Sequence, residues 1–190
     1  MLPEVVDAGP LGAAVRKGLV DAIEQAEADD SVKAVVIACE GQTFFAGADV
    51  SEFGTPKAMR EPTLFTLIRE IEQSAKPVVA AINGTCMGGG LELSLGCHYR
   101  VAQAKASIAL PEVRLGLLPG AGGTQRLPRA VGLETALNMI VTGTSVPAAK
   151  LASTALFDVV TDGEALEAAC DLARRVVAEK LPNKRLRDVK

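Results

Sequence analysis

Apolar residues recur along this chain with two different spacings, and each spacing predicts a type of element. Apolar positions three and four residues apart are typical of a helix that buries one face, whereas short continuous apolar runs are typical of strands inside a sheet. The helical spacing covers residues 11–28, 63–75, 89–96, 124–141 and 164–180. Apolar strand candidates cover residues 33–39, 77–82, 98–102 and about 157–160.

Because these helices and strands alternate, we predict an α/β fold in which helices cover a largely parallel sheet. The chain has 190 residues, of which 48% are hydrophobic, and this suits one compact domain. We expect the domain to occupy residues 1–180. Residues 181–190 contain Lys184, Arg185 and Arg187 and are predicted to form a basic tail or linker.

Composition narrows the classes of function. The net charge of −3 gives no indication of a nucleic-acid surface. The sequence has neither an apolar stretch of about 20 residues nor a signal-peptide pattern at Met1, so we predict a cytoplasmic protein without a membrane span. Its four cysteines lack paired or zinc-like spacing, so we expect reduced core residues and no metal site at Cys39, Cys86, Cys97 and Cys170.

His98 is the single histidine of the sequence. A Ser-His-Asp hydrolase would have to use it, yet the sequence has no GxSxG motif, so we interpret His98 as a structural residue. Acid and base chemistry near neutral pH then depends mainly on carboxylates. Three glycine-rich segments carry the candidate groups.

The first segment, residues 81–96, reads AINGTCMGGGLELSLG. An apolar strand runs into Gly88, Gly89 and Gly90, which leave main-chain N–H groups accessible at a helix start, where such donors are unpaired and attract an anion. Glu92 follows on the same helix face, about 4.5 Å further along the axis. The alternative is that the glycines only permit tight packing and that Glu92 complements the helix dipole.

The second segment, residues 108–126, reads IALPEVRLGLLPGAGGTQR. Glu112 follows Pro111, which fixes its own φ, and it is flanked by apolar residues. In an apolar wall, desolvation favours the protonated carboxyl and a role in proton transfer. The alternative is a surface ion pair between Glu112 and Arg114 or Arg126.

The third segment, residues 41–53, reads GQTFFAGADVSEF and follows an apolar strand. The small residues at positions 46–48 again expose main chain where a bulky side chain would block it. Alternatively, Gly47 only supplies a turn.

Taken in order, the motifs AGADVSEF, NGTCMGGGLELSLGC and LPEVRLGLLPGAGGTQRLPRAVG resemble the enoyl-CoA hydratase/isomerase family, also called the crotonase family. The resemblance extends from about Pro3 to the C-terminal region. GLLPGAGGTQRLPR followed by VTGTSVPAAKLASTALFDVV is similar to the hydratase half of the multifunctional fatty-acid β-oxidation enzyme. The resemblance implies a crotonase-like spiral of ββα repeats.

The resemblance also implies roles for individual residues. Ala48 and Gly89 match the two positions whose backbone N–H groups form the oxyanion hole, and Glu92 and Glu112 match the two glutamates that hold and split water. The positions implied to contact the rest of the substrate are Ala46, Asp49, Val50, Gly88, Pro111, Leu115 and Gly120.

The implied reaction is the reversible addition of water to a 2-enoyl-CoA thioester, giving a 3-hydroxyacyl-CoA, in fatty-acid β-oxidation. Main-chain donors would hold the enolate oxygen, Glu92 would deprotonate water, and Glu112 would protonate the second carbon. Neither a metal nor a separate cofactor is expected, because coenzyme A enters with the acyl-CoA substrate. The alternatives are a double-bond isomerase that uses one glutamate and an acyl-CoA-binding subunit without turnover. Both acids are present, which favours hydration.

Two departures from the family pattern affect the expected assembly. We expect the first edge strand of the family to be missing or trimmed, and Val6, Asp7 and Ala8 stand where the family often carries a basic residue near the coenzyme A phosphates. We also expect the C-terminal helices, which cover the acyl pocket and build trimers in single-function relatives, to be absent or shortened after about Lys180. We expect the uncovered apolar surface to drive self-association into a homo-oligomer, for example a trimer.

Overall fold

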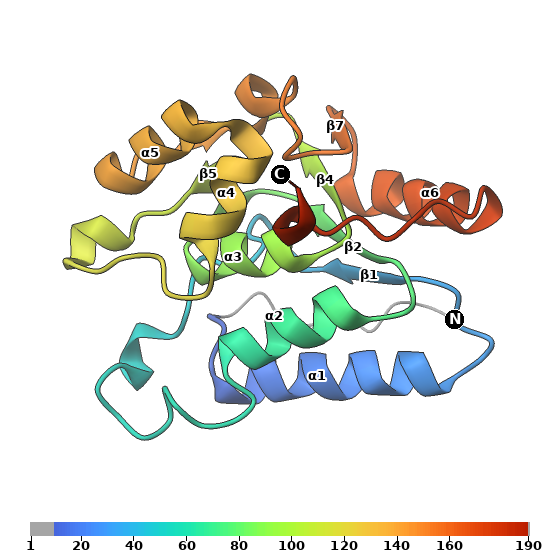
Figure 1. Cartoon of the computed structure of the whole chain (residues 1–190), viewed down its shortest axis with the longest axis horizontal. Coiled ribbons are helices and arrows are strands. Elements are labelled where there is room, and N and C mark those ends of the chain that lie inside the picture. The colour runs from blue at the N-terminus through green and yellow to red at the C-terminus, as the bar shows by residue number, and fades with distance from the viewer. Residues whose placement is uncertain (1–9, 190) are drawn as a thin grey trace.

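Four parallel strands form the larger of two sheets in the computed structural model, which describes residues 10–189 (Figure 1). In their order across the sheet, these strands are β1 (Val35–Ala38), β2 (Val78–Ile82), β4 (Tyr99–Gln103) and β7 (Val159–Thr161). The register pairs Val36 with Val79, and Val79 with Tyr99. All residues of β2 and β4 are buried, as expected for strands with both faces covered.

The smaller sheet contains β3 (Thr85–Met87), β5 (Ser107–Ala109) and β6 (Val146–Pro147). β3 follows β2 after a tight turn at Gly84, where a Cβ atom would lie 2.1 Å from the carbonyl oxygen of Gln42. The turn therefore requires glycine. β5 follows β4 after a short turn at residues 104–106 and pairs in parallel with β3.

Six helices surround the sheets within the described part of the chain. They are α1 (Ala13–Ala28), α2 (Leu64–Gln73), α3 (Gly89–Gly96), α4 (Gly123–Val131), α5 (Leu133–Thr142) and α6 (Ala165–Ala178). Four short 3-10 helices are η1 (Val50–Glu52), η2 (Glu112–Leu115), η3 (Ala148–Leu151) and η4 (Leu186–Asp188). The order β2-β3-α3 followed by β4-β5-α4 is the predicted ββα repeat, so the α/β fold class is confirmed.

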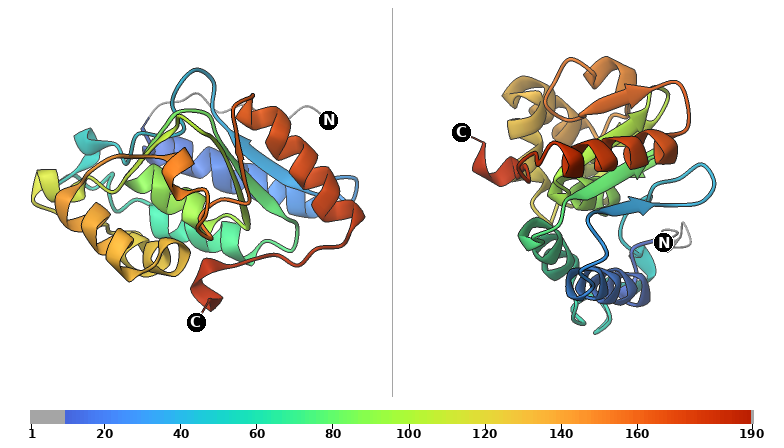
Figure 2. Two further views of the ribbon diagram at one scale, coloured as in Figure 1. Left: turned by 90° about the horizontal axis from the view of Figure 1, so that it is seen from above. Right: turned by 90° about the vertical axis from the view of Figure 1, so that its right-hand side faces the viewer.

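The two faces of β2 bury different cores. Val78, Ala80 and Ile82 belong to the cluster that contains side chains of α1, α2 and α3. Val79 and Ala81 face the other way and pack with α6. Figure 2 shows α6 lying along the larger sheet, with α1 on the other side of it. Because successive side chains of a strand point to opposite faces, β2 packs against the helices on both sides of the sheet.

The helix predicted over residues 124–141 is two helices. Gly132 separates α4 from α5 with φ 86°, a left-handed value that side chains rarely adopt, and its N–H donates to the Pro128 carbonyl oxygen. The apolar spacing continues across this glycine and therefore suggested one helix. The strands β3, β5 and β6 were not predicted, because runs of two or three residues carry no measurable period.

The segment predicted as a basic tail packs against the domain, so that prediction was wrong. Leu186 is buried, and the Tyr99 hydroxyl donates to the carbonyl oxygen of Pro182 at 2.6 Å. The amide of Asn183 donates to the carbonyl oxygen of Ser74 at 3.2 Å. The predicted loss of an edge strand concerns residues 1–9, which lie outside the described part of the chain.

His98 has the structural role that the sequence predicted. The ring is fully buried, its Nδ1 accepts a hydrogen bond from the Val78 N–H at 3.1 Å, and its Nε2 lies 3.3 Å from the Glu72 carbonyl oxygen. Burial lowers the pKa of this imidazole. The four cysteines, all within the described residues, form no disulfide, and Cys39, Cys86 and Cys97 are buried core residues, as predicted. Cys170 is only half-buried, so the prediction of a core position was wrong for this residue. Between residues 10 and 189, no helix combines the length and apolar character that a membrane crossing requires.

Candidate active site

A cavity of about 430 Å³ lies where the loop after β1, the start of α3 and the η2 region meet. Ten of the eleven predicted site residues line it, namely Ala46, Ala48, Val50, Gly88, Gly89, Glu92, Pro111, Glu112, Leu115 and Gly120. Asp49 does not line it. The Asp49 carboxylate instead caps η1 by accepting from the Ser51 N–H at 3.0 Å.

Two backbone N–H groups lie close together in the wall of this cavity. A Cβ atom on Gly89 would be 3.2 Å from the Ala48 nitrogen, which shows how near the two segments approach. The Met87 N–H donates to the Phe45 carbonyl oxygen at 3.2 Å and ties the segments together. Within residues 10–189, neither Ala48 N–H nor Gly89 N–H donates a hydrogen bond. Two donors beside one cavity can bind a single oxygen that carries negative charge.

The α3 helix places Glu92 one turn beyond Gly89, in the lining of the cavity. Glu92 is 3% exposed, and its Oε1 accepts hydrogen bonds from the N–H groups of Ala121 at 2.7 Å and Gly123 at 2.8 Å. A Cβ atom on Gly123 would lie 3.0 Å from this oxygen, so glycine makes the approach possible. Burial raises the pKa of Glu92, while the two N–H donors and the charge of Arg126 oppose that rise. One carboxylate oxygen is therefore fixed, and the other remains for chemistry.

Glu112 approaches the same cavity from η2. Its Oε1 would lie 3.2 Å from a Cβ atom on Gly88, which has φ 52° and is thus suited to glycine on two grounds. Its Oε2 is buried and has no hydrogen-bond partner in the described part of the protein. Burial raises the pKa of Glu112 to about 7, and the nearby charge of Glu92 adds to the rise. Glu112 can therefore carry a proton near neutral pH.

The alternative of an ion pair between Glu112 and Arg126 is excluded by the position of that arginine. Arg126 Nε lies 2.8 Å from Glu72 Oε1, and Arg126 Nη2 lies 2.9 Å from Glu72 Oε2. The guanidinium is thus held as a fork on a buried carboxylate, away from the cavity lining.

The structure adds residues that the sequence did not indicate. Most are apolar and come from the loop before α2, from α2 itself or from the loop after η2; they include Phe53, Met59, Leu64, Phe65, Leu117 and Leu118. Ala121 also lines the cavity and holds Glu92. Ala121 belongs to the glycine-rich run before α4, a pattern that predicts a helix start. The run gave no indication that the Ala121 N–H donates to Glu92.

Comparisons with known proteins show the family of this chain. The family described as enoyl-CoA hydratase/isomerase matches residues 3–188. A peroxisomal bifunctional enzyme of Danio rerio is 47% identical over 176 residues, which are 93% of this chain and 24% of that protein. The chain therefore spans about a quarter of the length of this relative.

Two further comparisons cover more of the partner protein. A probable enoyl-CoA hydratase of Bacillus subtilis is 38% identical over 182 residues, covering 92% of this chain and 70% of that protein. The crystal structure of enoyl-CoA hydratase from Bacillus anthracis superposes with a TM-score of 0.81 at 33% identity, covering 92% of this chain and 73% of that one.

Proposed function

The chain belongs to the enoyl-CoA hydratase/isomerase family, and on this premise we propose that it adds water reversibly to 2-enoyl-CoA thioesters, giving 3-hydroxyacyl-CoA. One observation carries the proposal: two carboxyl groups with raised pKa, Glu92 and Glu112, line the same cavity as a pair of unused backbone donors. The names of the relatives support hydration and a place in fatty-acid oxidation.

The proposed mechanism assigns each group a task. Glu92 takes a proton from water while the water oxygen attacks the third carbon of the enoyl group. The electron pair of the double bond moves toward the thioester, and the N–H groups of Ala48 and Gly89 stabilise the enolate oxygen. Glu112 then gives its proton to the second carbon, and the enolate returns to a thioester. Each proton is transferred by a carboxyl group, so no metal or separate cofactor is part of this proposal.

The substrate position follows from the shape of the cavity. Ala46, Val50 and the apolar residues near its mouth would contact the pantetheine part of coenzyme A, and Leu115 and Leu118 would contact the acyl chain. Asp49 would act through its cap on η1 rather than by touching the substrate. We retain a cytoplasmic location as a prediction, although several relatives are by name peroxisomal.

A direct assay tests this proposal. The purified chain should remove the conjugated absorbance of a short 2-enoyl-CoA, and Glu92→Gln and Glu112→Gln should each lower turnover by about 100-fold or more. The matched control is Glu167→Gln, which changes an exposed residue of α6 and should keep parental turnover. Binding of the thioester should persist in both catalytic variants.

Each outcome separates the alternatives. Turnover that survives Glu112→Gln but not Glu92→Gln, together with movement of a 3-enoyl double bond, would identify an isomerase that uses one glutamate. Thioester binding by the parental chain without any turnover would identify an acyl-CoA-binding subunit. Parental turnover in both variants would show that the acids are structural.

A further inference from the structure

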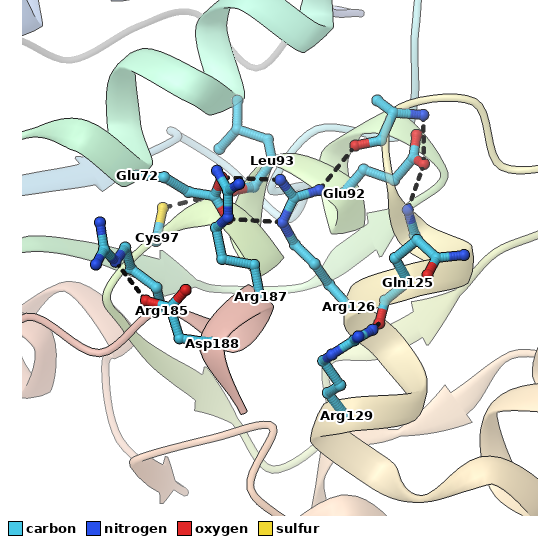
Figure 3. A network of polar contacts seen from close by, with 12 residues as sticks. Glu72, Glu92, Leu93, Cys97, Gln125, Arg126, Arg129, Arg185, Arg187 and Asp188 are labelled. Carbon is cyan, nitrogen blue, oxygen red and sulfur yellow. Dashed lines mark hydrogen bonds and ion pairs between the residues drawn. The ribbon is translucent and has the colours of Figure 1, made fainter. Parts of the chain in front are cut away.

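A second charged cluster lies behind the acid pair and outside the cavity lining. It joins Glu72 of α2, Arg126 of α4 and Arg187 of the C-terminal segment. Glu72 is 3% exposed, and a buried carboxylate without a cationic partner would be strongly destabilising. Arg126 and Arg187 supply the positive charge that this carboxylate requires. Figure 3 shows the Arg126 side chain between those of Glu72 and Glu92.

Arg126 connects this cluster to the Ala121–Gly123 loop through its own guanidinium. Two of its nitrogens bind Glu72, and the third, Nη1, donates to the carbonyl oxygen of Ala121 at 3.1 Å. The N–H of the same residue, Ala121, donates to Glu92 Oε1 at 2.7 Å. A continuous chain of hydrogen bonds therefore runs from Glu72 through Arg126 and Ala121 to Glu92.

The backbone is shaped to accept this arginine. Gly122 has φ 100°, and a Cβ atom at that position would lie 2.0 Å from Arg126 Nη1. The N–H of Arg126 also donates to the Gly122 carbonyl oxygen at 2.9 Å, at the start of α4. The guanidinium thus sits against the loop at a place that only glycine leaves open.

We propose that Glu72 and Arg126 are positioning residues that fix the Ala121–Gly123 loop and thereby orient the Glu92 carboxylate for its reaction with water. This inference rests on the proposed hydratase function and goes beyond it, because neither residue lines the cavity. The two hydrogen bonds to Glu72 fix the orientation of the Arg126 guanidinium. The third nitrogen, Nη1, then fixes the position of the Ala121 carbonyl group. A displacement of about 1 Å at such a distance from the chemistry is enough for about a 100-fold loss of rate.

Charge has a separate effect from orientation. Two titratable or charged groups are close to Glu92, namely Arg126 from α4 and Glu112 from η2, while Glu72 from α2 and Arg187 lie behind Arg126. The positive charge of Arg126 favours ionised Glu92, and Glu72 partly neutralises that charge. The acid limb of the pH profile is the fall in kcat at low pH, where Glu92 becomes protonated. Removing Arg126 therefore moves this limb to higher pH. Removing the Glu72 charge moves the limb to lower pH.

The decisive experiment is a kinetic comparison of four variants. Arg126→Gln and Glu72→Gln should lower kcat by about 10- to 100-fold with an unchanged KM, because the orientation of the base is lost while the cavity wall is kept. Their acid limbs should shift in opposite directions. Arg126→Lys should keep the parental limb but not the parental kcat, because lysine has the charge without the fork. The matched control, Arg174→Gln, breaks an exposed ion pair on α6 and should change nothing.

A second readout does not depend on activity. Amide hydrogen exchange at Ala121 and Gly123 should become faster in Arg126→Gln and stay unchanged in Arg174→Gln. If the parental chain has no hydratase activity, the proposed function fails, and this exchange measurement still decides whether Arg126 fixes the loop. If Glu72→Gln or Arg126→Gln does not fold, the double variant removes both buried charges, and its kcat and exchange rates give the answer.

Two results would overturn the proposal. One is parental kcat and parental amide protection in folded Arg126→Gln. The other is a raised KM with unchanged kcat, which would indicate that the cluster shapes the cavity rather than orients Glu92. Equal shifts of the acid limb in both single variants would likewise contradict the assigned electrostatic roles.

Discussion

At the scale of single residues, the candidate site depends on how closely backbone segments approach each other. Three adjacent glycines at the start of α3 illustrate this, since each meets a different neighbour. A Cβ atom on Gly88 would meet Glu112, one on Gly89 would meet Leu64 and Ala48, and one on Gly90 would meet the Phe45 backbone. Substitutions at adjacent positions should therefore have different consequences.

Gly89→Val should abolish turnover while the protein stays folded. Its Cβ would lie 2.9 Å from Leu64 Cδ2, a side-chain end that can move, and 3.2 Å from the Ala48 nitrogen. Access to the donor pair is then blocked, with an expected loss of about 100-fold or more. Steady-state kinetics and circular dichroism measure the two effects separately. Parental kinetics in a folded variant would remove the oxyanion assignment.

Gly90→Val is the matched comparison for that variant. A Cβ atom at Gly90 would lie 2.1 Å from the Phe45 carbonyl oxygen and 2.8 Å from the Phe45 carbonyl carbon. Backbone cannot move aside as a leucine side chain can, so this variant should fail to fold or melt far below the parental chain. A soluble, cooperative Gly90→Val protein would contradict the packing described for α3.

The Glu112 carboxyl group links activity and stability to pH. Because burial raises its pKa to about 7, turnover that needs protonated Glu112 should fall as pH rises through about 7. Its pKa in the folded chain exceeds the ordinary value of 4.5, so the unfolded chain loses this proton first. The free energy of unfolding that this group supplies is present below about 4.5 and lost as pH rises through about 7.

Chemical denaturation of Glu112→Gln across that range measures the effect. The variant should lose less stability than the parental chain between pH 4.5 and 7, while its turnover is lower at every pH. Parallel stability curves for the two proteins would show that Glu112 ionises normally in the folded state.

At the scale of elements, α1 anchors the loop that forms the rim of the cavity. Arg16 is 4% exposed, and its guanidinium donates to the carbonyl oxygens of Pro62 at 2.9 Å and Lys57 at 3.2 Å. It also pairs with Glu52 at 3.2 Å. Residues 58 and 59 of this loop line the cavity, so the helix positions a wall that has little regular structure of its own.

Arg16→Met should therefore weaken both folding and substrate binding. The substitution leaves Glu52 buried without its partner, and such losses typically destabilise by about 3–5 kcal/mol. With the loop released, KM for 2-enoyl-CoA should rise more than kcat falls. Urea unfolding and initial rates test the two parts, with Lys17→Met as the control because Lys17 belongs to an exposed pair. Unchanged stability would show that Arg16 is not the anchor.

The elements also show which features can be predicted from sequence. Segments of four to seven residues rich in apolar side chains predicted β1, β2, β4 and β7, since such segments carry a local signal. The resemblance to the enoyl-CoA hydratase/isomerase family, which rests on the glycine-rich motifs, implied ten of the residues that line the cavity. The pair of Glu72 and Arg126 could not be predicted, because the two residues are 54 positions apart and only the folded chain brings them together. Leu186 was missed because charged neighbours concealed one buried side chain in a basic segment.

At the scale of the whole molecule, exposed apolar side chains of the described residues form two groups. One is the cavity rim, where Val50, Met59, Leu115 and Leu118 are exposed. The other is one face of α5, formed by Leu133, Leu137 and Val141, which stand four residues apart. Apolar groups in such numbers on neighbouring surfaces are typical of interfaces between proteins.

The purified chain should therefore self-associate, and we propose a homo-oligomer such as a trimer. Light scattering at micromolar concentration measures the mass directly. Leu137→Lys, which places a charge in the middle of the α5 face, should reduce the mass, whereas Lys150→Gln on an exposed site elsewhere should not. A stable monomer that turns over 2-enoyl-CoA would show that the exposed surface needs no partner.

The return of the C-terminal segment to α2 has a consequence for synthesis of the chain. Asn183 contacts Ser74 across 109 positions, and Arg187 contacts Glu72 across 115. Proteins emerge from the ribosome N-terminus first, so β1, α2 and β2 are made long before Asn183 and Arg187. Glu72 can acquire Arg126 when α4 emerges, but it receives its second cation only after Arg187 has been made. The support behind the Ala121–Gly123 loop is therefore completed well after that loop itself has been synthesised.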